Sequence, residues 1–390
     1  MTAIQIPHSE YRDRWRRIQD QMDKDSLDLL LVYSDDHSLA GPANVRYISN
    51  FPAHFEPTCI LMRRAHDPIL LTGPESHEYA RLRSEVADVR IVKEFAPQDE
   101  EYPYTKLRPL RDIVCGVAGR ATNIGIAGLN LMPAKIFELF RRTLKARQIL
   151  DAESLLSGLR TIKSRNELNV IQEAYRIAEK GIEACLSAIE VGRMESEVAA
   201  EGEYAMRCMG AEGTAIDTIV ASGPNTRPIL ARTTSRRIRR NELVLVTIGP
   251  RFQGYNAAIG RPIYTGKPPP DIERSMTWAV AAQSMCRETL RPGVVGRDAE
   301  GTGRRFLEEK GLGKYFVYAG IHSVGLVEFE PPIMSPKSNH VIQPDMVLSI
   351  DIPLFLTPWG DLRYEDGFKV TKKGAVPLDN VRTGALTTIN

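Results

Sequence analysis

The spacing of apolar residues predicts alternating strands and helices in the first part of the chain. A continuous apolar run, typical of a strand buried on both faces, occurs at 27–34, and further strand-like runs occur at 59–62, 68–73, 89–95 and 123–128. Apolar residues recur at helical spacing between them, at 9–24, 76–86 and 133–147. This alternation predicts an α/β N-terminal domain over residues 1–155.

The pattern changes in the second part of the chain. A long helical block at 164–192 begins with Ser164 and Glu167 in the spacing of a capping box, and a second helix is predicted at 195–210. Further helices are predicted at 275–290 and 297–311, and strands at 217–223, 243–249, 255–266, 322–330, 346–355 and 365–374. We therefore expect an α+β fold, with a C-terminal domain over residues 156–390.

Composition and charge narrow the classes of protein that the chain can belong to. It has 390 residues, with 51 Lys and Arg against 49 Asp and Glu, so its formal charge of +2 gives no general attraction to nucleic acid or to anionic membranes. No run of about 18 apolar residues predicts a membrane span. The start of the chain is too polar for a secretory signal, and the five cysteines are scattered. These features predict a cytoplasmic protein.

Six segments of the second half are the main evidence on function. They are IVASGPN (219–225), LVLVTIGPRFQGYNAAIGR (243–261), LRPGV (290–294), AGIHSVGLVEFEPP (319–332), MVLSIDIP (346–353) and DLRYEDGFKVT (361–371). Their order and spacing resemble the pita-bread superfamily of methionine aminopeptidase, aminopeptidase P, prolidase and creatinase. The two-domain layout resembles the prolidase and creatinase branch. The resemblance implies a pita-bread C-terminal domain and a homodimer.

Peptidases of that superfamily bind two metal ions through two Asp, one His and two Glu. These five positions fall on Thr247, Ala258, His322, Asp351 and Glu365. A two-ion cluster needs bridging carboxylates, whereas threonine is a weak neutral ligand and alanine offers none. We therefore expect no metal ion and no other cofactor. The three remaining donors could hold one ion with water, and this alternative stays open.

Two accessory histidines of the peptidases fall on Leu230 and Phe329. Creatinase, a metal-free hydrolase on the same fold, also has alanine at the position of Ala258. Its general-base histidine, however, falls on Leu230 and its hairpin glutamate on Gly260. The main hypothesis is therefore a metal-independent hydrolase that cleaves a C–N bond in a small polar metabolite, creatinase-like or ectoine-hydrolase-like.

His322 is the candidate acid and base because its ordinary pKa lies near neutrality. Glu365 or Asp351 would orient it or activate water. Candidate substrate-binding residues are Thr247, Tyr255, Asn256, Arg261, Glu328, Arg363, His54 and Phe55. The last two lie on a loop that enters the partner's active site in creatinase-type dimers. The excess of carboxylates predicts a small cationic or zwitterionic substrate.

Two alternatives remain. A catalytically degenerate pita-bread binding protein would also have lost the ligands at 247 and 258, and Leu230 and Phe329 would then plug its cavity. An Xaa-Pro aminopeptidase or dipeptidase with an altered metal site would instead bind metal through the donors that are left.

Overall fold

The computed structural model describes residues 4–97, 100–144, 148–381 and 388–389, and its contacts divide the chain into two units. One unit is Ile6–Arg160, and the other is Met1–Gln5 with Thr161–Asn390. The division falls after Arg160. Among the described residues, none of the helices has the length and apolar character needed to cross a membrane.

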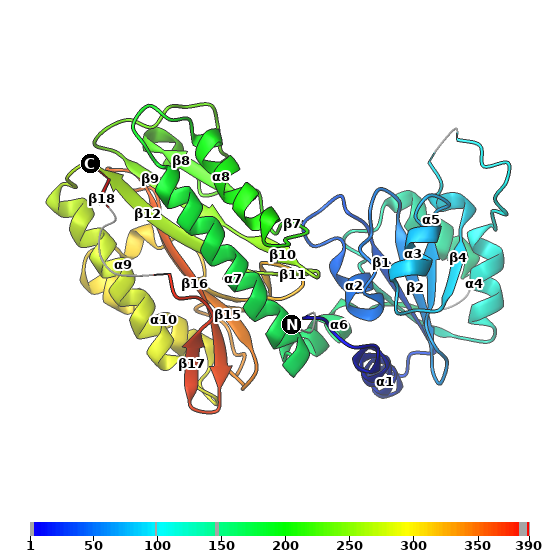
Figure 1. The fold of residues 1–390 in the computed structure, drawn as a ribbon. Helices are drawn as coiled ribbons and strands as arrows, with labels where there is room; N and C mark the ends of the chain where they lie inside the picture. Colours follow the sequence, from blue (N-terminus) through cyan, green and yellow to red (C-terminus); the bar gives the residue numbers. More distant parts are fainter. Residues whose placement is uncertain (1–3, 98–99, 145–147, 382–387, 390) are drawn as a thin grey trace. The chain divides into compact units, whose positions relative to one another are not determined.

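The N-terminal unit is built on one mixed sheet (Figure 1). Its six strands have the order β4-β3-β2-β1-β5-β6. The strands are β1 (Leu29–Ser34), β2 (Thr58–Arg63), β3 (Ile69–Thr72), β4 (Asp88–Ile91), β5 (Asn123–Ala127) and β6 (Gln148–Asp151). β1 pairs with β2 in the antiparallel and with β5 in the parallel sense. Every residue of β1 is buried, as its continuous apolar run predicted.

Six α-helices of the described residues accompany this sheet. They are α1 (His8–Lys24), α2 (Ala43–Ser49), α3 (His77–Arg83), α4 (Leu110–Ala118), α5 (Ala134–Thr143) and α6 (Glu153–Thr161). The helices α1, α3 and α5 were predicted. The helices α2, α4 and α6 and the strand β6 were not predicted. The strand β6 has only two apolar residues, both half-buried.

The C-terminal unit contains a large curved sheet and a small one. The large sheet has the order β14-β13-β15-β16-β12-β9-β8, with β17 added on β16 and β18 on β12, and the small one has the order β11-β10-β7. The strands are β7 (Gly213–Thr214), β8 (Ile219–Ser222), β9 (Leu243–Ile248), β10 (Pro250–Phe252), β11 (Tyr255–Asn256), β12 (Ile259–Thr265), β13 (Ile321–Ser323), β14 (Glu330–Met334), β15 (Val347–Leu354), β16 (Leu362–Thr371), β17 (Gly374–Pro377) and β18 (Thr388–Ile389). This arrangement confirms the predicted α+β fold.

Long helices pack on the two faces of the large sheet. They are α7 (Arg165–Ala188), α8 (Glu195–Cys208), α9 (Pro270–Thr289) and α10 (Gly296–Glu309). Ile350 and Ile352 of β15 belong to an apolar core that also contains residues of α9 and α10. On β16, Gly367 lies directly under the ring of Tyr175 from α7, so closely that a Cβ there would overlap the ring. Gly367 is paired with Ser349, so α7 packs on the face of β15 and β16 opposite that core, the face that also carries the polar residues Ser349, Asp351 and Glu365.

The capping box predicted at the start of α7 is present. The Ser164 hydroxyl accepts a hydrogen bond from the Glu167 main-chain nitrogen at 3.0 Å, and the Glu167 carboxylate accepts one from the Ser164 nitrogen at 2.8 Å. Ser164→Ala removes the first of these bonds, and we expect it to lower the free energy of unfolding by about 1 kcal/mol. Ser187→Ala, an exposed site within the same helix, is the control, and an equal loss in both variants would contradict the role of the cap.

Candidate active site

Four positions of the large sheet form one row across neighbouring strands. Thr247 of β9 is paired with Gly260 of β12, Gly260 with Glu365 of β16, and Glu365 with Asp351 of β15. Directly opposed residues of antiparallel strands have their side chains on the same face. Three of the five positions that the resemblance singled out, Thr247, Asp351 and Glu365, therefore share one face of the sheet.

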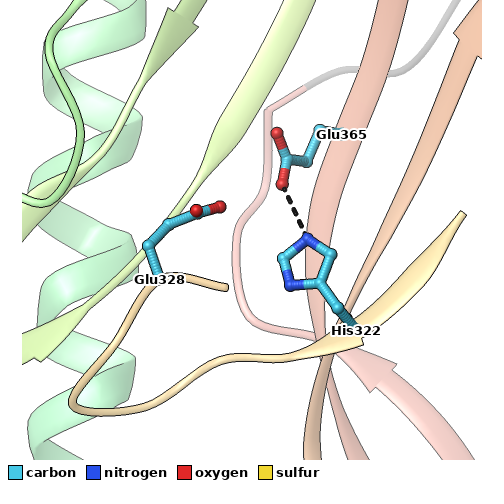
Figure 2. A group of neighbouring side chains, drawn as sticks. All are labelled: His322, Glu328 and Glu365. Carbon is cyan, nitrogen blue, oxygen red and sulfur yellow. Dashed lines mark ion pairs between the residues drawn. The ribbon is translucent and has the colours of Figure 1, made fainter. Parts of the chain in front are cut away.

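A group of three potential metal ligands lies on this face. The ligand atoms of His322, Glu328 and Glu365 all lie within 4.8 Å of one another. His322 comes from β13, Glu365 from β16, and Glu328 from the loop after β13, and Figure 2 shows the Glu328 carboxylate directed toward the other two side chains. His322 and Glu365 are buried, with 3.5 Å between His322 Nε2 and Glu365 Oε1.

Neighbouring groups orient these donors. His322 Nδ1 lies 3.2 Å from the carbonyl oxygen of Ser323. Because a carbonyl only accepts, Nδ1 carries the proton and Nε2 of the neutral ring is free to bind an ion. The Ser349 hydroxyl donates to Glu365 Oε1 at 2.9 Å and fixes that carboxylate.

Burial and mutual charge set the protonation of the three residues. Burial opposes the protonated form of His322, but the hydrogen bond to Glu365 and the charge of Glu328 outweigh it and raise the pKa of His322 to about 9. Burial and the charge of Glu365 raise the pKa of Glu328 to about 7. Burial alone would raise the pKa of Glu365, but His322 and Arg363 lower it. The ion-free site thus holds an imidazolium beside a carboxylate.

These pKa shifts predict that binding of a divalent ion releases protons. Near neutral pH the His322 imidazolium and part of the Glu328 carboxyl must lose their protons before they can act as ligands. We therefore expect the affinity for Mn²⁺ to increase from about pH 6 to about pH 9. Titration calorimetry in buffers of different ionisation enthalpy measures the released protons, and an affinity that does not change with pH would contradict this assignment.

Asp351 has a different set of partners. The Tyr318 hydroxyl donates to Asp351 Oδ2 at 2.6 Å and accepts from Arg363 Nη2 at 2.7 Å. Arg363 Nε lies 3.4 Å from the same carboxylate oxygen. Burial raises the pKa of Asp351 to about 6, and Arg363 forms an ion pair with it. The predicted role of Asp351, to activate water or orient His322, stays a prediction.

The residues fit one metal ion and do not fit a two-ion cluster. Thr247 Oγ1 is buried and has no hydrogen-bond partner among the described residues, and Ala258 offers no ligand atom. Asp351, which would have to serve a second ion, already has the Arg363 guanidinium 3.4 Å from its Oδ2, while its Oδ1 has no hydrogen-bond partner among the described residues. The group of His322, Glu328 and Glu365 has one imidazole and two carboxylates, and three protein ligands with water are a common set for one ion.

Three of the predicted substrate-binding residues are engaged within the protein. The Tyr255 hydroxyl donates to Glu167 at 2.8 Å, and Asn256 Nδ2 donates to the carbonyl of Gly325, in the loop that carries Glu328, at 3.0 Å. Arg261 pairs with Asp366 at 2.5 Å. Side chains alternate along a strand, so Arg261 lies on the face opposite Gly260 and Glu365. Asn256 is placed to support the Glu328 loop.

His54 and Phe55 belong to the N-terminal unit, in the loop before β2. The His54 ring and the Phe55 main-chain nitrogen both contact Asp36 Oδ2, and both side chains are exposed. Their role in substrate binding stays a prediction. Leu230 and Phe329 are also exposed, at 76% and 47%, so neither fills the core of the domain.

Sequence reasoning missed Tyr318, Ser349 and Lys163. Tyr318 precedes His322 by four residues, and Ser349 precedes Asp351 by two and so shares its face of β15. Lys163 is buried, donates to Ser323 Oγ at 2.9 Å and pairs with Glu330 at 3.3 Å. The period of two along a predicted strand could have identified Ser349, whereas the sequence gives no signal for the contact of Lys163.

Comparisons with known proteins agree with this layout. Residues 169–372 match metallopeptidase family M24, and residues 14–162 match the creatinase/prolidase N-terminal domain. The chain is 28% identical over 366 residues to an Xaa-Pro dipeptidase of Pyrococcus horikoshii, covering 94% of this chain and 96% of the relative. An Xaa-Pro dipeptidase of Pyrococcus furiosus is 27% identical, covering 91% and 97%.

A solved structure also shows the similarity of this chain to prolidases. The prolidase from Pyrococcus horikoshii superposes with a TM-score of 0.83 at 27% identity, covering 95% of this chain and 99% of that one. The main hypothesis of a metal-independent, creatinase-like hydrolase is therefore wrong, because the matching family is one of metallopeptidases and the relatives are named as dipeptidases. The expectation that no metal takes part fails with it. Since the family match spans more than half of the chain, this protein belongs to metallopeptidase family M24.

Proposed function

We propose that this protein is a metal-dependent dipeptidase of the Xaa-Pro type, with one divalent ion bound by His322, Glu328 and Glu365. The observation that carries the proposal is the convergence of these three donors on one face of the sheet. The two Pyrococcus relatives, which match over nearly their whole length, support the type of substrate. A free dipeptide is a small zwitterion, in keeping with the substrate class that the carboxylates predicted.

A divalent ion bound at these donors would polarise the scissile carbonyl and lower the pKa of a water molecule that attacks it. The remaining contributions come from the chain itself. Ser323 sets the proton position on His322, and Ser349 holds Glu365, so both donors keep their direction without a substrate present. Such preorganisation reduces the cost of ordering the site at each turnover.

Phe329 supports a substrate with a proline ring. Its own ring lies 4.4 Å from the ring of His322, centre to centre, and 47% of the residue is exposed. A pyrrolidine ring beside the metal donors would bury part of this apolar surface, whereas a small or polar residue would bury less. We therefore expect Xaa-Pro dipeptides to be cleaved faster than Xaa-Ala dipeptides with the same first residue.

The proposal is tested by removing metal with a chelator and assaying Ala-Pro and Ala-Ala in parallel. We expect no turnover of the chelated protein, recovery on addition of Mn²⁺, Co²⁺ or Zn²⁺, and a preference for Ala-Pro. Turnover that survives complete removal of metal would contradict the metal-dependent mechanism. If the reloaded protein cleaves neither dipeptide, the proposed activity is wrong.

We also infer that two copies of the chain associate and that the protein acts in the cytoplasm. In such a dimer, the loop with His54 and Phe55 is predicted to enter the partner's active site, so dimerisation would contribute to substrate binding. Light scattering during size-exclusion chromatography measures the mass in solution. A mass near twice 43.6 kDa is expected, and a mass of one chain at working concentrations would contradict the dimer.

A further inference from the structure

We propose that Arg363 is a built-in cation that restricts the metal centre to one divalent ion, and that Gly260 provides the space for its side chain. This inference rests on the proposed metal-dependent function and concerns the other end of the same row of residues. In this inference, the Arg363 guanidinium occupies the position beside Asp351 that a second cation would otherwise take.

Arg363 lies beside Asp351, although its Nε forms no hydrogen bond within the described residues. The guanidinium reaches Asp351 Oδ2 at 3.4 Å through Nε and the Tyr318 hydroxyl at 2.7 Å through Nη2. The hydroxyl in turn donates to the same Asp351 oxygen at 2.6 Å. Arg363 and Asp351 are only 7% and 4% exposed, so little solvent screens the pair. An ion approaching Asp351 meets a fixed positive charge.

Gly260 explains how the arginine stem fits on this face. Gly260 stands in the row between Thr247 and Glu365 and has no side chain of its own. A Cβ at this position would lie 3.2 Å from both Cγ and Cδ of Arg363 and 3.1 Å from Cβ of Glu365. These separations are tighter than ordinary van der Waals contact, so any larger residue would press on the arginine stem.

The charges of the site balance with one ion and not with two. Glu328, Glu365 and Asp351 contribute three negative charges when ionised. One divalent ion and Arg363 contribute three positive charges, with His322 neutral as a ligand. A second divalent ion would leave two uncompensated positive charges in a buried site, which is unfavourable. Thr247 and Ala258 supply no carboxylate to offset that excess.

The test is a calorimetric titration of the metal-free full chain with Mn²⁺, together with elemental analysis after desalting. The wild type is expected to bind one ion per chain. Arg363→Met removes the cation at similar size, so a second ion would leave one uncompensated positive charge instead of two. We expect the first ion to bind at least as tightly and a second, weaker binding event to appear. Arg363→Lys retains a positive charge and should remain at one ion.

Gly260→Ala tests whether the Arg363 stem needs the space beside residue 260, and it leaves the charge of the guanidinium unchanged. We expect its midpoint of thermal unfolding to fall by several degrees more than that of Gly213→Ala, because a Cβ on Gly213 would meet nothing within 4 Å. Equal effects in the two variants would overturn the role of Gly260. This measurement and the wild-type titration remain informative even if Arg363→Met fails to fold.

The outcomes separate this inference from the proposed function. Two ions bound to the wild type, or weaker binding in Arg363→Met without a second event, would overturn the role of Arg363 while leaving a metallopeptidase. A wild type that binds no ion would overturn both. One ion in the wild type and in Arg363→Lys, with a second, weaker ion in Arg363→Met, is the result that the smaller positive excess of the methionine variant predicts.

Discussion

Replacing His322 with alanine is expected to abolish stoichiometric binding of Mn²⁺ and to lower kcat/KM for Ala-Pro by about a thousandfold or more. His322 supplies the only imidazole of the three-donor group, and its Nε2 lies 3.5 Å from Glu365. Without it, two carboxylates would have to hold the ion alone. Calorimetry measures the binding and a steady-state assay the turnover.

The matched control for this variant is His340→Ala, which removes an exposed histidine from the same unit. It should leave metal binding and turnover unchanged. The His322 variant should also keep the circular dichroism spectrum of the wild type, since one buried ring is lost without breaking a strand. Full turnover in a folded His322→Ala protein would remove this residue from the mechanism.

The second large effect distinguishes Glu328 from Asp351. Glu328→Gln keeps the size of the side chain but removes a charged ligand, so we expect the affinity for Mn²⁺ to fall by about a hundredfold. Asp351→Asn removes a carboxylate that is already paired with Tyr318 and Arg363. This variant should keep one bound ion, although an unpaired buried guanidinium will lower its stability by about 3–5 kcal/mol.

The two variants give opposite results if the ligand positions inferred from motif spacing apply instead. In that case Asp351→Asn would lose the ion and Glu328→Gln would retain it. When both variants are measured by the same titration, the conclusion depends only on which variant loses the ion and not on the absolute affinity. Retention of the ion by Glu328→Gln together with its loss from Asp351→Asn would show that the three-donor group is assigned to the wrong residues.

Much of the fold could be predicted from local patterns. The apolar run of β1 and the capping box of α7 act through neighbours in the sequence, and both are present in the structure. The strand β6 could not be predicted, because its two apolar residues are half-buried through tertiary contacts, namely pairing with β5 and, for Ile149, packing against the core of the N-terminal unit. Boundaries of short elements depend on such tertiary contacts rather than on the segment itself.

The candidate site was predictable in part. Motif order identified His322 and Glu365, which lie together in the structure. The metal-free site was predicted from the motif positions alone, because the residues at 247 and 258 are not the Asp ligands of the peptidases. These positions could not show that the loop after β13 turns the Glu328 carboxylate back toward His322. That contact depends on the path of a loop, which no spacing along the chain encodes.

The two arginines of the predicted set illustrate the same limit. Arg261 and Arg363 both stand beside motif residues, but strand alternation and register place them on opposite faces of the sheet. Alternation could have separated them once Gly260 and Glu365 were paired. The partner of Arg363 could not be predicted, since Tyr318 reaches Asp351 from another segment.

The central claim is that this member of the family binds one divalent ion through His322, Glu328 and Glu365. A crystal grown with Mn²⁺ and measured for anomalous scattering tests it most directly, since the anomalous map places each ion without reference to the protein. One peak among the three donor atoms is the predicted result. Two peaks, one of them between Thr247 and Asp351, or no peak at the three donors, would contradict it.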